Sequence, residues 1–190
     1  EDIGMMNMLP GMTVINPCDY NQTKNATLAI AKHNGPVYLR FGRPKVPNFT
    51  ADEPFIIGKA IKLKAGTDVS IFATGHTVWE ALEASKQLNK NNVSCEIINI
   101  TTIKPLDVDT VLESITKTQC AVTAEEHQIL GGLGSSIAQT ISQKMPIPIE
   151  FVGVNDTFGE SGKPKDLMKK YKIDSESVFH AVMKVLKRKK

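Results

Sequence analysis

Two arginines stand at the end of a short apolar stretch and could bind an anion. Residues 37–41 alternate between apolar and polar side chains, which is the period of a β-strand. Gly42 follows, and Pro44 prevents the strand from continuing. Arg40 and Arg43 are therefore expected at the carboxyl end of a strand, where open α/β sheets bind their ligands. Each charge-assisted hydrogen bond from a guanidinium to a phosphate contributes about 1.5–3 kcal/mol.

The geometry of this strand end depends on Gly42 and on the spacing of the arginines. Gly42 has no side chain that would keep a ligand away from the backbone. Residues three apart in a strand point to opposite faces unless the glycine breaks the extended backbone. We expect one arginine to face the ligand and the other to face a carboxylate or a subunit contact. A structural ion pair is the alternative role for either guanidinium.

A second group of titratable side chains, Glu125, Glu126 and His127, follows a short buried strand expected at residues 120–124. Two carboxylates and an imidazole at the carboxyl end of a strand could transfer protons. The sequence offers no nucleophile or cofactor motif that such a base would serve. We therefore favour a helix-capping or interface role, and keep Glu125 and His127 as secondary site candidates.

A glycine-rich stretch, residues 131–136, could direct backbone N–H groups at a phosphate from the start of a helix. Its spacing matches neither the dinucleotide-binding pattern nor the P-loop, and no acidic residue ends the following strand at the ribose-binding position. Tight packing of a strand against a helix is the favoured explanation for these glycines.

Composition and charge exclude several classes of protein. The formal net charge of +3 owes much to the carboxyl end, where five of the last seven residues are basic. No aromatic residues are interleaved with these lysines, so a cationic last helical turn is favoured over nucleic-acid binding. No apolar run approaches the about 20 residues of a membrane span, which predicts a soluble protein without a membrane partner.

Cysteines and histidines show no metal-site pattern. The three cysteines are odd in number and form no CxxC pair, which favours buried thiols in a reducing cytoplasm over disulfides or zinc. Three histidines lack a second ligand at metal spacing, and we interpret each as a surface or capping residue. These residues are Cys18, Cys95, Cys120, His33, His76 and His180.

The elements that position these side chains form two α/β units separated by a linker. Strands are expected at residues 12–16 and 37–41, parallel to each other and joined by a helix that Asp19 caps. Residues 44–56 contain three prolines and little periodicity, which indicates an extended linker and a domain boundary. The chain opens with Glu1 inside an amphipathic pattern, so we expect it to be a piece of a longer protein.

Beyond the linker, alternating strands and helices predict a complete three-layer α/β/α domain with a mainly parallel five-stranded sheet and one antiparallel strand. The tight turn at residues 65–68 predicts that the strands on either side of it are antiparallel neighbours. Asp107 and either Asp174 or Ser175 are expected to cap helices. The five strands are expected at residues 59–64, 69–73, 93–100, 120–124 and 149–154.

Motifs spread over nearly the whole chain resemble transketolase, and they occur in the same order. Thr-Ile-Lys-Pro-Leu-Asp and Ser-Gly-Lys-Pro are typical of the animal-type and split transketolases. Deoxyxylulose-phosphate synthase and the β subunits of 2-oxoacid dehydrogenases share the arginine strand end more loosely. They are the alternatives, together with a non-enzymatic Rossmann-like interaction module. The matching segments are residues 1–10, 14–19, 38–44, 102–107, 125–134 and 161–164.

The resemblance implies a cytoplasmic thiamine-diphosphate- and Mg²⁺-dependent transferase of the pentose phosphate pathway, which moves a two-carbon ketol unit from a ketose phosphate to an aldose phosphate. Residues 1–43 resemble the end of the pyrimidine-binding domain, a partial α/β thiamine-diphosphate-binding domain. After the linker at 44–56, residues 57–190 resemble the C-terminal domain. The implied partners are sugar phosphates, the remaining domains or an N-terminal subunit, and a second copy in a homodimer.

The resemblance also assigns site residues. The arginine that holds the substrate phosphate in the family falls on Arg43, whereas Arg40 matches a position without an assigned substrate contact and is a secondary candidate. The groups that bind the cofactor and Mg²⁺, and those that activate the aminopyrimidine, are expected ahead of Glu1. We therefore expect no catalytic residue, cofactor ligand or metal ligand within the chain, and no activity from the chain alone.

Overall fold

Five strands form the larger of two sheets in the computed structural model, which describes residues 1–189. This sheet has the strand order β3-β5-β4-β7-β8, and the smaller sheet has the order β2-β1-β6. The strands are β1 (Thr13–Ile15), β2 (Val37–Leu39), β3 (Ile61–Lys64), β4 (Val69–Ala73), β5 (Cys95–Asn99), β6 (Thr102–Lys104), β7 (Ala121–Gln128) and β8 (Ile149–Val154). The helices are α1 (Asp2–Met8), α2 (Tyr20–Ile30), α3 (Thr77–Lys90), α4 (Val108–Thr118), α5 (Leu133–Lys144), α6 (Pro164–Lys170) and α7 (Ser175–Leu186).

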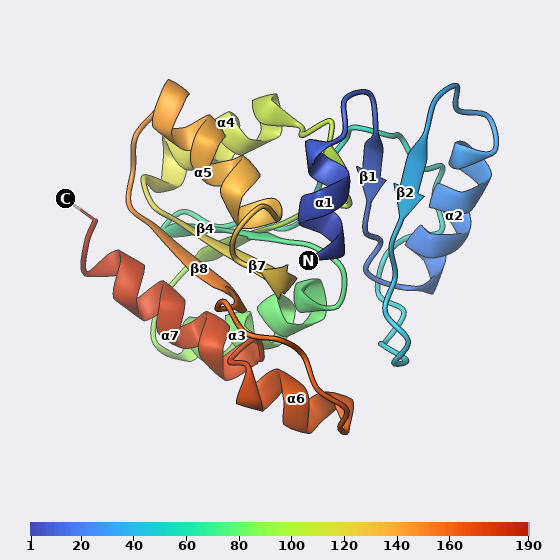
Figure 1. Ribbon diagram of the computed structural model, residues 1–190. Helices are drawn as coiled ribbons and strands as arrows, with labels where there is room; N and C mark the ends of the chain where they lie inside the picture. Colours follow the sequence, from blue (N-terminus) through green and yellow to red (C-terminus); the bar gives the residue numbers. More distant parts are fainter. Residues whose placement is uncertain (190) are drawn as a thin grey trace.

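Helices cover both faces of the larger sheet. α3 and α7 pack on one face, and α4 and α5 pack on the other (Figure 1). Every residue of β4 is buried, because this strand lies between its parallel neighbours β5 and β7. Ile71 and Val178 belong to the apolar cluster on the first face, and Phe72 and Ile137 belong to the cluster on the second. The predicted three-layer α/β/α fold with one antiparallel strand is confirmed.

The pairing predicted for β3 is wrong. This strand is the antiparallel one, but it pairs with β5 at the edge of the sheet and not with β4. The turn after β3 crosses the start of β5, where Thr67 N and Asp68 N donate to the carbonyl oxygen of Ser94 at 3.0 and 2.8 Å. Gly66 permits the crossing, because a Cβ there would lie 2.1 Å from the carbonyl carbon of Cys95. A short turn therefore joins strands that are two places apart.

The smaller sheet carries the strand end with the two arginines. Its strands β1 and β2 are parallel and joined by α2, as predicted. The side chain of Asp19 caps α2 by accepting a hydrogen bond from Gln22 N at 3.0 Å. Asp19 also accepts from Phe49 N at 2.9 Å and Thr50 N at 2.7 Å. The linker, which has no helix or strand at any of its described residues 44–56, is therefore held against α2.

A third strand, β6, joins the smaller sheet from beyond the linker and was not expected from the sequence. It pairs antiparallel with β1, and its Ile103 is buried in a cluster with Ile3 and Val14. The sequence predicts instead that residues 101–107 start a helix, with Asp107 as its N-cap. Asp107 does cap α4, accepting from Thr110 N at 3.3 Å, but the residues before it are a strand.

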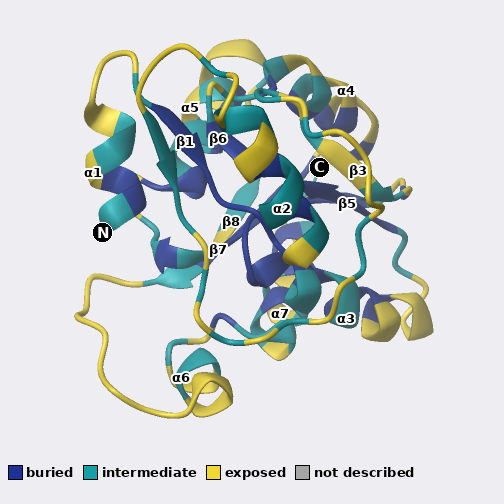
Figure 2. Cartoon of the chain, turned by 90° about the vertical axis from the view of Figure 1, so that its right-hand side faces the viewer, coloured by how far each residue is buried: buried dark blue, intermediate teal, exposed yellow. Residues whose placement is uncertain are grey.

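The remaining elements agree with the sequence except at two places. β7 continues to Gln128, so the group Glu125 to His127 lies inside a strand and not after it. α6 has no counterpart among the predicted elements, and the exposed segment that leads to it is drawn in yellow in Figure 2. Asp174 caps α7 through Ser177 N at 3.0 Å. No helix within residues 1–189 is long and apolar enough to cross a membrane.

Candidate functional site

Arg40 and Arg43 both follow β2, but their surroundings differ. The Arg40 guanidinium reaches the larger sheet, where Nη2 donates to the backbone oxygen of Glu126 at 3.1 Å and Nη1 lies 3.4 Å from Oε2 of the same residue. Its Nε lies 3.5 Å from an oxygen of Asp2 at the start of α1. Arg40 therefore has the carboxylate partners expected for one of the two arginines.

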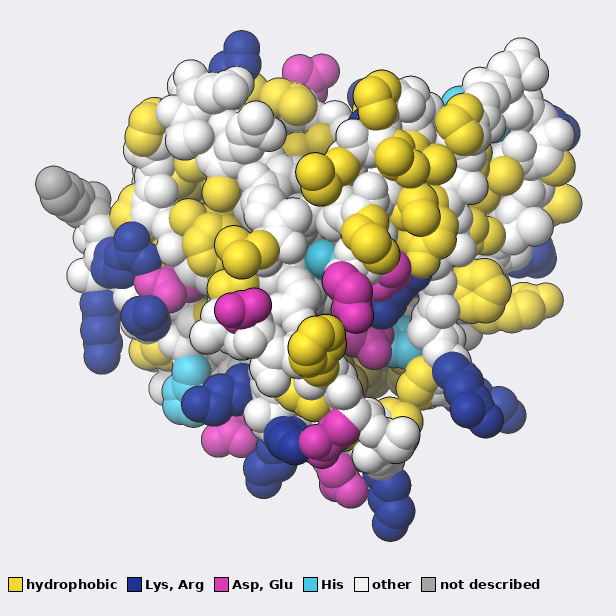
Figure 3. All heavy atoms as spheres, in the orientation of Figure 1, with side chains coloured by type: hydrophobic (Ala, Val, Ile, Leu, Met, Phe, Trp, Pro, Cys, Tyr) yellow, Lys and Arg dark blue, Asp and Glu magenta, His cyan; other side chains and the backbone are white. Residues whose placement is uncertain are grey.

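Arg43 is exposed, and among residues 1–189 no carboxylate forms an ion pair with it. Lys45, two residues further on, is exposed as well. Figure 3 shows basic side chains projecting from this corner of the molecule, at the lower right. The strand end thus offers an unneutralised guanidinium to solvent at the edge of the sheet where α/β proteins bind anions.

The space next to Gly42 is filled by an imidazole ring. A Cβ built on Gly42 would lie 2.1 Å from Cε1 and 2.5 Å from Nε2 of His76. His76 is only 8% exposed, immediately precedes α3 and makes no side-chain cap. The interpretation of His76 as a surface or capping residue is therefore wrong. Among the described residues, the His76 ring is the group that approaches Gly42 so closely that only glycine fits there.

Glu126 joins these contacts into one network. Its Oε2 lies 3.2 Å from Nδ1 of His76 and 3.4 Å from Nη1 of Arg40. Burial alone would raise the pKa of Glu126, but the hydrogen bond from His76 and the charge of Arg40 outweigh it and hold the pKa below its usual value. A charged carboxylate in β7 thereby connects the end of β2 with the start of α3.

Two hollows adjoin this network. The larger, about 610 Å³ in volume, is lined by Arg40, Glu126 and Trp79 together with α6. The smaller, about 320 Å³, lies at the carboxyl ends of β1 and β2. His76 and residues 44–46 line both. Figure 3 shows acidic and basic side chains around a hollow in the lower half of this face. The larger volume is in the range of small-molecule sites.

Glu125 occupies the helix start that could have held a phosphate. Its two carboxylate oxygens accept hydrogen bonds from Leu133 N at 2.7 Å and Gly134 N at 2.8 Å, at the first turn of α5. A Cβ on Gly132 would lie 2.0 Å from Oε2 of Glu125. Glu125 is thus a helix cap, and Gly132 allows the strand and the helix to approach this closely. Burial raises the pKa of Glu125 to about 7.

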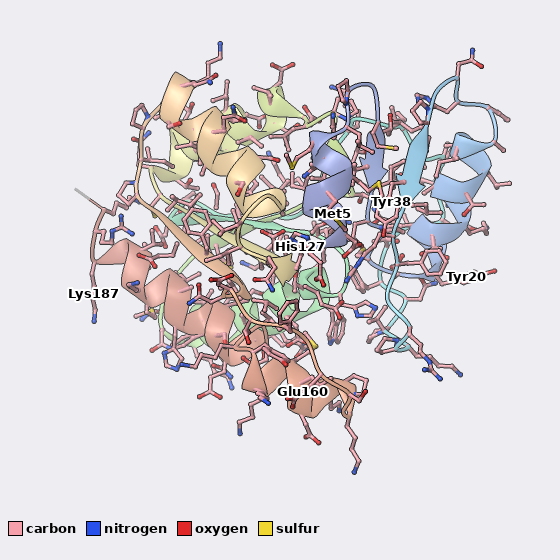
Figure 4. The ribbon with its side chains drawn as sticks, viewed as in Figure 1. Met5, Tyr20, Tyr38, His127, Glu160 and Lys187 are labelled. Carbon is pink, nitrogen blue, oxygen red and sulfur yellow. The ribbon has the colours of Figure 1, made fainter. Side chains whose placement is uncertain are left out.

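His127 fastens α1 to the larger sheet. Its Nε2 accepts a hydrogen bond from Gly4 N at 3.1 Å, and its Nδ1 donates to the backbone oxygen of Gln128 at 2.7 Å. Figure 4 shows His127 beside α1, the helix that carries Met5. Burial lowers the pKa of His127, which favours the neutral ring that these two hydrogen bonds require. Both nitrogens are engaged, so the contacts are those of an interface residue.

The other candidate ligands stay apart. His33 lies 3.4 Å from the hydroxyl of Thr13, and the exposed His180 lies 3.7 Å from Glu176 on the same helix. No group of three or more His, Cys, Asp or Glu side chains in the described part of the chain could hold a metal ion. The three cysteines are free and buried, as predicted.

Comparison with known families finds two family models that match different parts of the chain. Residues 58–178 match the family model for the transketolase C-terminal domain, which is more than half of the chain. The chain belongs to the transketolase family. Residues 1–48 match the model for the transketolase pyrimidine-binding domain, so the strand end with Arg40 and Arg43 lies within that match. Glu126 and His76 lie within the match to the transketolase C-terminal domain.

Relatives and a solved structure agree with this assignment. A 6-deoxy-6-sulfo-D-fructose transketolase subunit from a Clostridium species is 40% identical over 100% of this chain and 59% of its own length. An apulose-4-phosphate transketolase subunit of Phocaeicola vulgatus is 32% identical over 99% of this chain and 61% of its own. A split-gene transketolase, solved as an inactive β4 tetramer, superimposes with a TM-score of 0.97 at 42% identity. The match covers 63% of that solved chain. The chain therefore spans about three fifths of the length of these relatives.

Proposed function

We propose that the chain supplies the C-terminal section of a thiamine-diphosphate-dependent transketolase, which transfers a two-carbon ketol unit from a ketose phosphate to an aldose phosphate in the pentose phosphate pathway. The matches to both transketolase domain models support this proposal. The relatives named for transketolase subunits support it further. The names of these relatives refer to different sugars, so the sugar substrate is to be identified by assay of the assembled enzyme.

In this proposal residues 1–43 are the end of a pyrimidine-binding domain, residues 44–56 are the linker and residues 57–190 are the C-terminal domain. The chain acts in the cytoplasm with the remaining domains or with a separate N-terminal subunit, in an assembly that contains two copies of each. The split-gene relative whose β4 tetramer is described as inactive supports the need for such a partner. We expect no ketol transfer by the chain alone.

Thiamine diphosphate and Mg²⁺ belong, in this proposal, to the other domains of the assembled enzyme. The bound cofactor supplies the carbanion chemistry of such transferases. Within residues 1–189 no cluster of ligating side chains suits a metal ion, and the glycine-rich helix start is taken by Glu125. The described residues therefore do not by themselves fit a magnesium diphosphate, and no reaction step is assigned to them.

The contribution of this chain is to hold the phosphate of the sugar through Arg43. One observation carries this assignment: of the two arginines at the strand end, Arg40 is engaged by Glu126 and Asp2, whereas Arg43 is exposed and has no ion pair among the described residues. A guanidinium can bind a phosphate through two parallel N–H···O bonds. Fixing the phosphate at one end orients the sugar for reaction at the other.

Replacing Arg43 by alanine in the assembled enzyme tests the assignment. Loss of a charge-assisted interaction of about 1.5–3 kcal/mol should raise the KM for a phosphorylated sugar about tenfold to a hundredfold. The KM for its unphosphorylated analogue should change little. Steady-state assays with both substrates measure the two values. An equal rise for both would contradict the phosphate role.

A matched control is Lys32→Ala. Lys32 is also exposed and cationic, but it follows α2, at the opposite end of β2. The variant removes the same charge from the same segment without touching the strand end. It should leave both KM values unchanged, which separates a local contact of Arg43 from a general effect of net charge.

A further inference from the structure

The backbone on which Arg43 stands is held in place by residues of the larger sheet. The His76 ring lies so close to Gly42 that a Cβ there would approach Cε1 to 2.1 Å, Nε2 to 2.5 Å and Nδ1 to 2.8 Å. Gly42 is the residue directly before Arg43. A buried ring therefore packs on the peptide segment that leads into the proposed phosphate ligand.

The same ring is itself fixed by a charged contact. Oε2 of Glu126 lies 3.2 Å from Nδ1 of His76, and it also lies 3.4 Å from Nη1 of Arg40. The backbone oxygen of Glu126 accepts a second hydrogen bond from Arg40, at 3.1 Å. One residue of β7 thus restrains the strand end on both sides of Gly42, through Arg40 before it and through His76 beside it.

The contacts of His76 and Glu126 with Gly42 and Arg40 form a clamp on the strand end, and backbone hydrogen bonds complete it. Arg40 N donates to the oxygen of Ile15 in β1 at 2.8 Å. On the other side, Gly75 N, next to His76, donates to the oxygen of Asn16 at 3.2 Å. The start of α3 and the end of β2 are therefore each tied to neighbouring residues at the end of β1. Their relative position is set by regular elements and not by the loop itself.

We propose that His76 and Glu126 are positioning residues for phosphate binding by Arg43. They act through Gly42 and Arg40 and do not touch the sugar themselves. This inference rests on the proposed function of Arg43. A binding group must be held within about 0.5 Å of its productive position, so a strand end released from the clamp binds the phosphate more weakly.

A compensating pair of substitutions in the assembled enzyme tests the proposal. Gly42→Ala places a methyl group on the His76 ring and should raise the KM for a phosphorylated sugar about tenfold, with little change for the unphosphorylated analogue. His76→Ala alone loosens the clamp and should raise the same KM severalfold. In the double variant the methyl group has room, so its KM should be lower than that of Gly42→Ala alone.

Gly159→Ala is the control for adding a methyl group. A Cβ at Gly159 would have no heavy atom within 4 Å among the described residues, so this methyl group disturbs no packing and should leave the ratio of the two KM values unchanged, although Gly159 also lines the larger hollow. Thermal unfolding of each variant reports whether the assembly is folded. A merely structural role of the clamp would lower the melting temperature without changing the ratio of the two KM values.

Glu126→Gln keeps the side-chain volume and removes the charge that joins Arg40 to His76, so it tests the clamp even where Gly42→Ala prevents assembly. It should raise the KM ratio severalfold. An unchanged ratio in Glu126→Gln, or a double variant no better than Gly42→Ala, overturns the proposal. If Arg43→Ala itself shows no phosphate selectivity, the proposed function fails first. If Arg43→Ala shows phosphate selectivity but the variants of His76, Gly42 and Glu126 do not, only the positioning role is wrong.

Discussion

The pH dependence of stability gives the sharpest test of the buried carboxylate of Glu125. This side chain is 1% exposed, and its oxygens accept from two N–H groups at the start of α5. Burial raises its pKa to about 7, although the N–H groups of Gly134 and Leu133 oppose the rise. The perturbation that isolates this group is Glu125→Gln, which has nearly the same shape and does not ionise.

The magnitude follows from the difference in proton affinity between the folded and the unfolded chain. The unfolded value is 4.5 and the folded value is about 7, so the folded protein binds this proton more tightly. The stability that Glu125 contributes is therefore fully present below pH 4.5 and is lost as the pH rises to about 7. Since one pKa unit corresponds to about 1.4 kcal/mol, the loss amounts to about 3 kcal/mol.

Urea unfolding of the wild type and of Glu125→Gln at several pH values measures this loss. At about pH 5 the variant should be less stable by about 1–3 kcal/mol, because the amide nitrogen of glutamine cannot accept from one of the two backbone N–H groups. By about pH 8 the wild type has lost stability that the variant keeps, so the difference should vanish or change sign.

Glu53→Gln is the control, since Glu53 is exposed and forms no ion pair among residues 1–189. Its difference from the wild type should be small, because the substitution removes no buried contact. All other titrating groups are shared by the three proteins and cancel in the comparison. A difference between wild type and Glu125→Gln that stays constant, or that widens as the pH rises, would refute the reasoning about burial.

Two further measurements test contacts outside the strand end. Asp19→Ala removes the cap of α2 and the acceptor for Phe49 N and Thr50 N, so the unfolding free energy should fall by about 2–4 kcal/mol, more than the about 1 kcal/mol typical of a cap alone. A loss no larger than a cap's would mean that the linker is not held there. The three cysteines are buried with thiol pKa values raised by burial, so a thiol-specific disulfide reagent should react only after unfolding. Fast reaction of any thiol in the native protein would contradict this.

Strands with a strong local signal were predictable, and strand partners were less so. β4 is apolar except for Ser70, and β5 contains the apolar pair Ile97 and Ile98; both strands are fully buried, and both were predicted close to their observed ranges. The partner of β3 was assigned from the length of the turn alone. The contacts of Gly66 with Cys95, which carry the chain past β5, join residues 29 positions apart and leave no local pattern. β6 is three residues long and becomes a strand only through its pairing with β1.

The strand end could be predicted because its signals are local in the sequence. Its surroundings could not, because they depend on tertiary contacts. Alternation, glycine and proline mark the end of β2 within a few residues, which places Arg40 and Arg43 without tertiary information. His76 meets Gly42 only after the two sheets pack together. One signal could have found the contact: His76 closely follows the predicted strand at residues 69–73, and Glu126 the strand at 120–124. Parallel strands bring their carboxyl ends to one edge of a sheet.

The segment 44–56, which the sequence predicts to be a linker between domains, is not a gap in the packing. The smaller sheet takes β6 from beyond the linker, and α1 is fastened to β7 through Gly4 and His127. Arg40 reaches β7 as well, through Glu126. Because the residues that orient Arg43 come from the C-terminal unit, that unit participates in the proposed phosphate site without contacting the substrate. A domain far from the reacting atoms can in this way set how firmly the sugar is held.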